Sequence, residues 1–365
     1  PAALPDIGTE YGPEDEGCIF ATSGTTDRPK CVVWDHMGLW LCGLSTIDFT
    51  GMTGDDRLLE YRTFSWLSPQ IVTFMPFISL GLTVVMAEGF SRSRFIGWIR
   101  DYKISVAAGV PTVINMLLDD PVPFDPPEIA SLRVMTASSA PLAPDRWRQF
   151  EKHYGIRLLQ FYGASEGGWL CGNRHDKFRI GTAGPPARHM DLALIVADGT
   201  VCGIGEEGEI TIRGAQTATA SITADGEWED RSSFRLTERT RVGDLGVLDE
   251  DGFVTVTGRI KDVILRGGVS IAPLEIDAAV MTHPGVHEAA VIGVPDPIWG
   301  EEIACYVVPA DTGTVTADDI LSHAAAALPE FKRPRYVEFI PALPKNARGK
   351  VRREDLKALW SEISG

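Results

Sequence analysis

The sequence lacks the patterns that mark several common classes of protein. Its 6 cysteines form no C-x-x-C pair and no Cys/His cluster at metal-ligand spacing, which argues against a zinc site and predicts free thiols. It has no run of about 18 apolar residues to span a bilayer, and no charged leader followed by an apolar stretch. Lys and Arg number 34 against 50 Asp and Glu, and the net charge of −16 argues against nucleic acid and anionic lipid as partners. These absences predict a soluble, cytoplasmic protein without nucleic-acid binding or stable membrane insertion.

The chain is long and apolar enough to fold into more than one domain. It has 365 residues, of which 44% are hydrophobic, and at about 100–200 residues per domain this length suggests two or three domains. In the first half, short apolar runs and a helical stretch follow the pattern of a sheet wound with helices. The expected strands cover residues 82–87, 105–110, 132–137 and 156–161. A helix is expected over 144–154, with Pro144 in its first turn and Gly155 just past its end.

The pattern changes near residue 190 and again near residue 260. Asp198-Gly199 and Asp251-Gly252 each stand between two apolar runs, which predicts β-hairpins and therefore an antiparallel region. Beyond residue 260 the expected elements are two helices and an intervening strand, over 272–282, 317–328 and 286–294 respectively. This last part predicts a small α/β domain of about a hundred residues.

A hydroxyl-rich segment, TSGTTDRPK at 22–30, follows the apolar run GCIFA. Hydroxyl groups, a glycine that lets backbone N–H groups approach an anion, and a lysine are suited to holding phosphate. The segment is not a Walker A loop, because that motif requires G-x-x-x-x-G-K-[ST]. Taken alone, it is equally compatible with an ordinary Ser/Thr-rich turn.

Five further polar phrases follow in order: YGASE at 162–166, RVGDLG at 241–246, GRIKD at 258–262, RGG at 266–268 and LPKNARGK at 343–350. YGASE comes directly after an expected strand, and α/β sheets bind ligands at the carboxyl ends of their strands. Each phrase also has a structural alternative: a turn carboxylate for Asp244, a solvated loop acid for Glu166 and a tight turn at 267–268. Their joint occurrence favours a functional interpretation.

In this order, the phrases resemble the adenylate-forming (AMP-binding) superfamily over residues 22–353. The runs YRTFSWLSPQ, GASEGGW and RGGVSIAPLEID look most like its acyl-CoA synthetases, in the carnitine-CoA-ligase-like branch. The resemblance implies an α/β fold with a large domain of layered α/β sheets and a β-subdomain over 1–258. A hinge over 259–262 and a small, mobile α+β C-terminal domain over 263–365 would follow. Because Pro1 stands only about twenty residues before the hydroxyl-rich segment, we expect the large domain to be N-terminally incomplete.

The implied activity is ATP-dependent activation of a carboxylic acid through an acyl-adenylate to an acyl-CoA thioester. The implied cofactors are ATP, Mg²⁺ and coenzyme A, and the partner is a small-molecule carboxylic acid. Two alternatives stay open: an adenylation enzyme that loads a separate carrier protein, and a nucleotide-binding protein without turnover. The acid and the choice between a monomer and a homodimer are also open.

The resemblance assigns a role to particular side chains. Lys350 and Glu166 are the implied catalytic residues, with Lys350 countering the repulsion between two anions and Glu166 holding Mg²⁺. The implied nucleotide-binding residues are Thr22, Ser23, Gly24, Thr25, Thr26, Lys30, Ser139, Ala140, Pro141, Tyr162, Gly163, Ser165, Asp244 and Arg259. The implied hinge residue is Lys261, and the implied coenzyme A contacts are Gly267 and Gly268. Candidate walls of the acyl pocket are Phe64, Trp66, Gly167 and Gly168, of which the two aromatic residues could equally be core.

Overall fold

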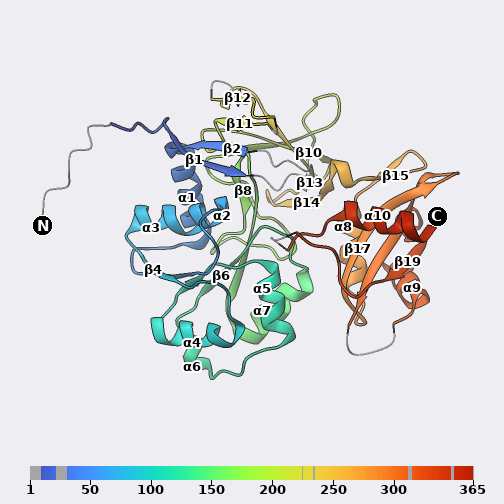
Figure 1. Ribbon diagram of the computed structural model, residues 1–365, viewed down its shortest axis with the longest axis horizontal. Coiled ribbons are helices and arrows are strands. Elements are labelled where there is room, and N and C mark those ends of the chain that lie inside the picture. The colour runs from blue at the N-terminus through green and yellow to red at the C-terminus, as the bar shows by residue number, and fades with distance from the viewer. Residues whose placement is uncertain are drawn as a thin grey trace, which may run out of the picture.

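Two lobes of unequal size, joined near residue 260, make up the chain (Figure 1). The structure is a computed structural model that describes residues 10–21, 31–223, 225–232, 235–310, 315–346 and 349–364. The larger lobe contains a six-stranded sheet and two four-stranded sheets, and the smaller lobe contains a five-stranded sheet. The α/β class and the succession of a large and a small C-terminal domain are thereby confirmed. The exact boundaries at 258 and 263 stay predictions.

The six-stranded sheet, in the order β4-β3-β5-β6-β7-β8, forms the base of the larger lobe. β3 to β7 run parallel, and β8 pairs antiparallel with β7. The strands are β3 (Arg57–Glu60), β4 (Thr83–Met86), β5 (Val106–Ala107), β6 (Val134–Ala137), β7 (Arg157–Ala164) and β8 (Gly168–Gly172).

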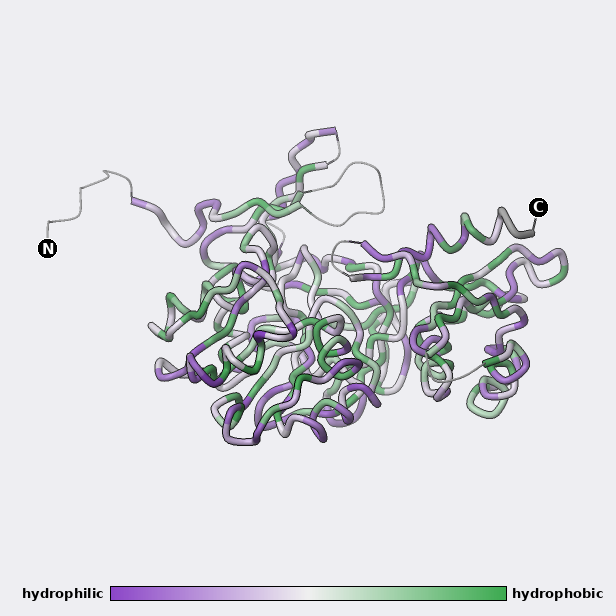
Figure 2. Tube along the Cα trace, turned by 60° about the horizontal axis from the view of Figure 1, so that its bottom comes forward, coloured by the Kyte–Doolittle hydropathy of each residue, from purple (hydrophilic) through white to green (hydrophobic). Residues whose placement is uncertain are grey.

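Helices cover both faces of this sheet. Consecutive strand residues point to opposite faces, so each of two neighbouring residues packs against the helices on its own side. Leu58 belongs to the same buried cluster as Phe49 of α1, and its neighbour Leu59 to a second cluster with Phe95 of α4 and Trp147 of α7. The helices of this lobe are α1 (His36–Thr50), α2 (Leu67–Pro69), the π-helix η1 (Gln70–Phe74), α3 (Met75–Leu80), α4 (Arg92–Tyr102), α5 (Pro111–Asp119), α6 (Pro126–Ile129) and α7 (Pro144–Tyr154). Figure 2 shows the hydrophobic segments inside the lobe and hydrophilic segments along its rim.

Two antiparallel sheets complete the larger lobe. One has the order β1-β2-β11-β12, with β1 (Glu16–Ala21), β2 (Cys31–Asp35), β11 (Ala220–Ile222) and β12 (Trp228–Asp230). The other has the order β14-β13-β10-β9, with β9 (Asp191–Ile195), β10 (Glu207–Arg213), β13 (Thr240–Leu248) and β14 (Val254–Arg259). The hairpin at Asp251-Gly252 is confirmed by the pairing of β13 with β14.

The other expected hairpin is reduced to a turn. After Asp198-Gly199 a single bridge joins Ile195 to Val201. The chain then turns back, and the backbone N–H of Gly203 donates to the Glu206 carboxylate at 2.8 Å. The second arm is therefore too short to form a strand.

The smaller lobe consists of a sheet in the order β16-β15-β18-β17, with β19 parallel to β18. Its buried residues form two clusters, one on each side of the long β17–β18 hairpin. The elements are η2 (Ile260–Asp262), β15 (Ile264–Arg266), β16 (Val269–Ile271), α8 (Pro273–Met281), β17 (Val286–Asp296), β18 (Gly300–Pro309), α9 (Ala317–Ala327), η3 (Glu330–Lys332), β19 (Tyr336–Phe339) and α10 (Arg353–Ser364). No described helix has the length and apolar character needed to cross a bilayer.

The expected helices agree closely with the structure, whereas one strand is shorter. α7 matches the predicted range, and Gly155 ends it in the left-handed conformation with φ 68°. The strand expected over 105–110 is reduced to the two residues of β5. Its continuation is lost because Gly109 donates its N–H to the Thr136 hydroxyl at 3.0 Å and Pro111 begins α5.

Candidate active site

The loops that follow the parallel strands meet at one edge of the six-stranded sheet. Because β3, β6 and β7 run in the same direction, their carboxyl ends lie at the same edge. The loop after β3 carries Phe64 and Trp66, the loop after β6 carries Ser139, Ala140 and Pro141, and the turn after β7 carries Ser165 and Glu166. The sheet thus gathers predicted site residues from three separate loops.

The turn of Ser165 and Glu166 is held through its backbone. Trp34 donates its indole N–H to the Ser165 carbonyl at 3.2 Å, and Ala218 donates its backbone N–H to the Glu166 carbonyl at 2.9 Å. Gln216, which is fully buried, donates its amide to the Gly167 carbonyl at 3.3 Å. These bonds fix the main chain of the turn and leave the half-buried Glu166 carboxylate available for other contacts.

Gly167 and Gly168 pack on the large-domain core. A Cβ on Gly167 would lie 2.4 Å from Ile212, and one on Gly168 would lie 2.3 Å from the Cys42 sulfur. Phe64 packs edge-to-face on Phe74, with ring centroids 6.4 Å apart. The role of these residues in an acyl pocket stays a prediction.

The loop after β6 has two unusual features. Ser139 has φ 74°, in the left-handed region that residues other than glycine rarely occupy. Its neighbour Ser138 is fully buried, and its hydroxyl finds no partner among the described residues. A strained residue beside an unsatisfied buried hydroxyl is typical of a ligand site.

Asp244 forms the centre of a second cluster, above this edge. Tyr162, at the end of β7, donates its hydroxyl to Asp244 Oδ2 at 2.6 Å, and Arg259 forms an ion pair with Asp244, with 2.9 Å between Nε and Oδ1. Asp244 and Arg259 face each other across β13 and β14. Burial, together with the charge of Asp244, raises the pKa of Tyr162 well above its ordinary value, so its hydroxyl stays protonated and acts as a donor.

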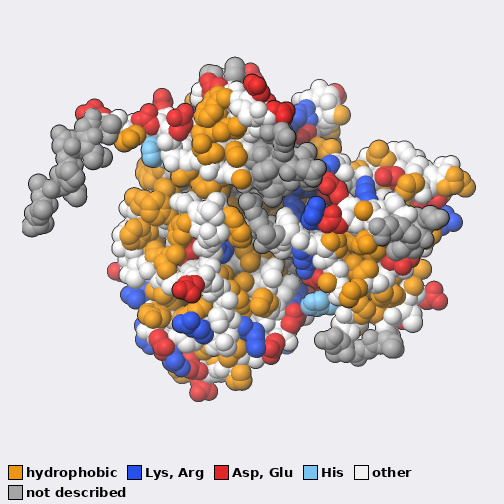
Figure 3. Space-filling view, in the orientation of Figure 1, with side chains coloured by type: hydrophobic (Ala, Val, Ile, Leu, Met, Phe, Trp, Pro, Cys, Tyr) orange, Lys and Arg blue, Asp and Glu red, His pale blue; other side chains and the backbone are white. Residues whose placement is uncertain are grey.

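The small domain brings Lys350 to this cluster. Its loop touches the large domain at Gly349, where a Cβ would lie 2.6 Å from the Thr112 hydroxyl of α5, so a larger residue would push the loop away. Burial and the charge of Arg259 lower the pKa of Lys350 to about 8, against the opposing effect of Asp244 and Asp262. The ammonium therefore lies within electrostatic reach of the Asp244–Arg259 pair. Figure 3 shows charged side chains gathered where the two lobes meet.

Of the remaining predicted residues, Lys261 lies close enough for its charge to lower the pKa of Lys350, and the others form an exposed turn or lie outside the described residues. Thr22, Ser23, Gly24, Thr25, Thr26 and Lys30 are outside them, although the flanking strands place Ala21 opposite Cys31. Lys261 in η2 is paired with Glu354 of α10 at 3.4 Å. Gly267 and Gly268 form the exposed turn between β15 and β16, where Gly267 donates its backbone N–H to the Trp299 carbonyl at 2.8 Å.

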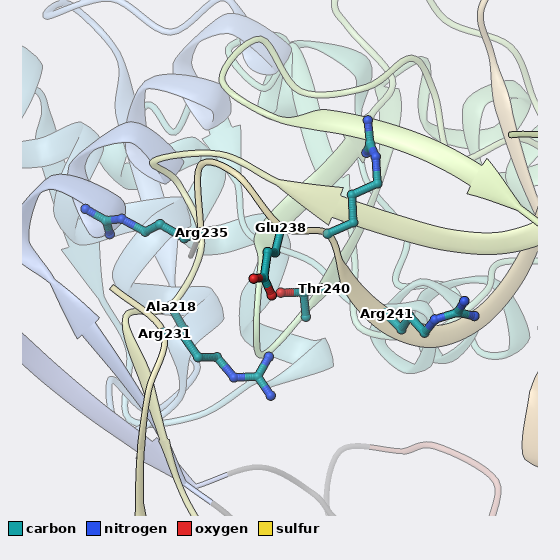
Figure 4. Close-up of a pocket in the computed structure, with 7 residues that line it drawn as sticks. Ala218, Arg231, Arg235, Glu238, Thr240 and Arg241 are labelled. Atoms are coloured by element: carbon teal, nitrogen blue, oxygen red, sulfur yellow. The ribbon is translucent and has the colours of Figure 1, made fainter. Parts of the chain in front are cut away.

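A cavity of about 420 Å³ opens beside the start of β13. It is lined by Ala218, Arg231, Arg235, Glu238, Arg239, Thr240 and Arg241. Figure 4 shows the guanidinium groups of Arg231, Arg235 and Arg241 pointing in different directions. Carboxylates pair with three of the arginines: Asp35 with Arg235, Asp191 with Arg239 and Glu209 with Arg241. The cavity is therefore not a convergent anion site.

Comparison with protein families decides the identity. The model of the AMP-binding enzyme family matches residues 5–220, and that of the AMP-binding enzyme C-terminal domain matches residues 275–350. The chain belongs to the AMP-binding enzyme family. The predicted adenylate-forming superfamily and its CoA-ligase branch are confirmed.

Curated relatives and solved structures agree with this assignment. Sulfoacetate–CoA ligase of Cupriavidus necator is 33% identical over 93% of this chain and 66% of its own length. Feruloyl-CoA synthase of an Amycolatopsis species is 29% identical over 97% of the chain and 71% of its own length. The ATP-bound structure of MatB from Rhodopseudomonas palustris superposes with a TM-score of 0.90 and 28% identity, covering 98% of this chain and 70% of that one. The chain thus spans about two thirds of the length of these relatives.

This AMP-binding enzyme contains site features that its sequence did not reveal. The bond between Tyr162 and Asp244 joins residues 82 positions apart. Tyr162 was predicted only as a nucleotide-binding residue, and no local signal in the sequence indicates that its hydroxyl donates to Asp244. Ser138 and Thr112 were also missed, although Ser138 directly precedes the predicted Ser139 and could have been found by extending that segment by one residue.

Proposed function

We propose that this AMP-binding enzyme activates a carboxylic acid with ATP and then transfers the acyl group to coenzyme A. One observation carries the proposal: the Lys350 loop of the small domain meets the large domain at Thr112, where the charges of Asp244 and the partly exposed Arg259 act on Lys350. The names of the relatives, which act on chemically different acids, support the reaction class and leave the acid open.

Asp244 is suited to binding the ribose of the nucleotide. Its carboxylate has about four acceptor positions; Tyr162 uses one on Oδ2, and Arg259 is ion-paired with Oδ1. The remaining positions can accept bonds from two ribose hydroxyls. The unsatisfied Ser138 hydroxyl directly precedes Ser139, Ala140 and Pro141, which the resemblance assigns to nucleotide binding, and it fits a ligand at this place.

Lys350 would act when the carboxylate attacks the α-phosphorus. A new O–P bond forms, the bond to pyrophosphate breaks, and acyl-AMP and pyrophosphate are the products. An ammonium group between the two anions offsets their repulsion and stabilises the charge of the transition state. In the second step the thiol of coenzyme A attacks the acyl carbon, the bond to AMP breaks, and AMP and a proton leave.

The donor set fits Mg²⁺ held jointly with phosphate oxygens. The described residues contain no group of three side chains able to hold a metal ion. Mg²⁺ commonly binds through one or two carboxylates and the phosphates of its substrate, and Glu166 would supply such a carboxylate. When bound, the ion would neutralise charge on the leaving pyrophosphate.

The second step needs the small domain in another position. In this arrangement the charge of Asp244 acts on Lys350, while Gly267 in the exposed turn is bonded to Trp299 of the small domain itself. Rotation of the small domain about residues 259–262 would move Lys350 away from the Asp244 cluster and bring the turn of Gly267 and Gly268 toward it. The ion pair between Lys261 and Glu354 would be one contact at this hinge.

Pyrophosphate exchange with a panel of acids tests this proposal. The panel contains sulfoacetate, ferulate, indoleacetate and oxalate, the acids named for the relatives, together with octanoate and benzoate. We expect ATP- and Mg²⁺-dependent exchange with at least one acid, and thioester formation once coenzyme A is added. Binding of ATP without exchange would contradict the proposal, whereas exchange without a thioester product would favour transfer to a carrier protein.

A further inference from the structure

A fully buried ion pair closes the carboxyl end of β3. Glu60 has no exposed surface, and Arg62 is 8% exposed. Arg62 donates from Nε to Glu60 Oε1 at 2.9 Å and from Nη2 to Oε2 at 2.8 Å, so the pair is bidentate. This geometry is the strongest that an arginine and a carboxylate can adopt.

The pair also connects three consecutive segments of chain. Glu60 Oε1 accepts bonds from the backbone N–H groups of Tyr61 and Arg62, at 3.0 and 2.9 Å. Oε2 accepts a bond from the Thr73 hydroxyl in η1 at 2.7 Å, and Arg62 Nη1 donates to the Ser68 hydroxyl in α2 at 2.9 Å. The end of the strand, the loop and the α2–η1 turn are therefore held by a single pair of charges.

The segment held in this way faces the carboxyl edge of the sheet. Between the two charges and η1 lie Phe64 and Trp66, both only partly buried, and Phe74 is 41% exposed. Gln70 donates to the Phe64 carbonyl at 2.6 Å, which fixes the loop against η1. Short π-helices such as η1 occur frequently at functional sites.

Stability alone gives little reason for a charged pair at this place. Buried ion pairs are often no more stabilising than well-packed apolar residues of similar volume. Their geometry does impose one arrangement on the groups they bond. Here those groups belong to the segment that carries Phe64 and Trp66.

We propose that Glu60 and Arg62 are positioning residues that hold the 61–74 segment in the shape that selects the acid substrate. Neither side chain contacts the acid, because their polar atoms are engaged with the segment itself. The inference rests on the proposed function, since it needs an acid to select.

A single hydroxyl provides a mild test. Thr73→Val removes the bond to Glu60 Oε2 while keeping the volume of the side chain. We expect the ratio of kcat/KM for the two best acids of the panel to change by about threefold or more, because small displacements near a substrate alter rates strongly. The KM for ATP should stay within about twofold, and Thr73→Ser, which keeps the hydroxyl, should restore the original ratio.

The opposite end of the same strand supplies a matched control. Ser105 donates its hydroxyl to Asp56, just before β3, at 2.6 Å. Ser105→Ala removes a comparable bond to a buried carboxylate, and we expect the ratio between the acids to stay unchanged. Hydrogen–deuterium exchange should rise over residues 61–74 in Thr73→Val and stay unchanged there in Ser105→Ala.

The outcomes separate this inference from the proposed function. Exchange activity with an unaltered acid ratio in Thr73→Val would overturn the inference and leave the proposed function intact. An equal change of ratio in Ser105→Ala would also overturn it, because the effect would then be general destabilisation. Absence of pyrophosphate exchange with every acid would overturn the proposed function, and with it the selection of an acid by this segment.

Discussion

At each of the two edges of the six-stranded sheet, a buried carboxylate binds an arginine and a hydroxyl, but the two groups hold different parts of the chain. At the amino edge Asp56, which is 7% exposed, binds Arg133 at 2.8 Å and the Ser105 hydroxyl at 2.6 Å. At the carboxyl edge Glu60 binds Arg62 and the Thr73 hydroxyl. The amino-edge partners begin neighbouring strands and tie strand to strand. The carboxyl-edge partners belong to the segment that follows, so the pair shapes a loop.

Backbone strain shows the same contrast. Lys103 and Ser139 are the non-glycine residues with positive φ in the described parts of the chain, at 52° and 74°. Lys103 ends α4 ahead of β5, at the amino edge, and its side chain is exposed. Ser139 follows β6 at the carboxyl edge, beside the unsatisfied Ser138 hydroxyl. One strained residue ends a helix, and the other lies in a loop that we propose to border the nucleotide.

The largest expected effect concerns the residue that reaches the carboxyl edge from the other lobe. In Lys350→Ala, pyrophosphate exchange should fall by about 10²–10³, the usual loss for one group that stabilises transition-state charge. Thioester formation from supplied acyl-AMP and coenzyme A should persist. Lys345→Ala, which removes a surface lysine paired with Glu288, serves as control. If Lys350→Ala kept the original rate of pyrophosphate exchange, Lys350 would have no role in the formation of the acyl-adenylate.

At the amino edge, Asp56→Asn should lower the free energy of unfolding by about 2 kcal/mol, a value reduced because Arg133 is partly exposed. Burial raises the pKa of Asp56, but bonds to Arg133 and Ser105 outweigh it, and the pKa lies below its ordinary 3.8. The stabilisation is therefore present above pH 3.8 and is lost as the pH falls through the lower folded-state value. Denaturant unfolding of both proteins at a series of pH values measures this stabilisation. If Asp56→Asn also changed the preference among acids, the amino edge would not be purely structural, and the proposed difference between the two edges would be wrong.

Asp244→Asn should raise the KM for ATP by about tenfold, because a neutral amide accepts weaker hydrogen bonds than a carboxylate. Initial-rate exchange kinetics measure this. Asp249→Asn, at the other end of the same hairpin, removes a partner of the exposed Arg179 and should leave the KM unchanged. Equal effects of both changes would indicate a loss of hairpin stability in place of a nucleotide contact.

The pH dependence of exchange should report on Lys350. Because its pKa is lowered to about 8 in the free enzyme, kcat/KM should fall as the pH rises through that value and the ammonium loses its proton. In Lys350→Arg the guanidinium stays charged, so the alkaline fall in kcat/KM should disappear. The exchange rate itself should be lower, because a guanidinium does not have the shape of an ammonium group. If kcat/KM of Lys350→Arg fell with rising pH as in the original protein, a group other than Lys350 would cause the alkaline fall.

The smallest expected effects compare the two strained residues. Lys103→Gly should stabilise the protein by about 0.5–1 kcal/mol, because glycine relieves the left-handed strain at some cost in unfolded-state entropy. Ser139→Gly should gain a similar amount but lower pyrophosphate exchange. Thermal unfolding and pyrophosphate-exchange rates of both variants test this. If the two variants were equally active, the proposal that Ser139 belongs to the nucleotide site would be wrong.

Much of the fold could be predicted because its signals are local. Pro144 and Gly155 mark the ends of α7, and alternating Leu58 and Leu59 point to opposite faces of β3. β5 was predicted too long, because its apolar residues continue past the point where Thr136 and Pro111 end the pairing. The sequence also supplied the predicted site residues as ordered phrases, but it did not indicate which of them contact one another.

The sequence by itself determined the elements, the family and the types of side chain available for the chemistry. Periodicity, capping and short motifs act over a few residues, and all of these can be read along the chain. Only the tertiary structure decided that Tyr162 bonds to Asp244, that Gly349 touches Thr112, and that Lys350 reaches the pair across the junction. Such contacts depend on how strands and lobes pack, because residues far apart in sequence meet only when the intervening chain has folded.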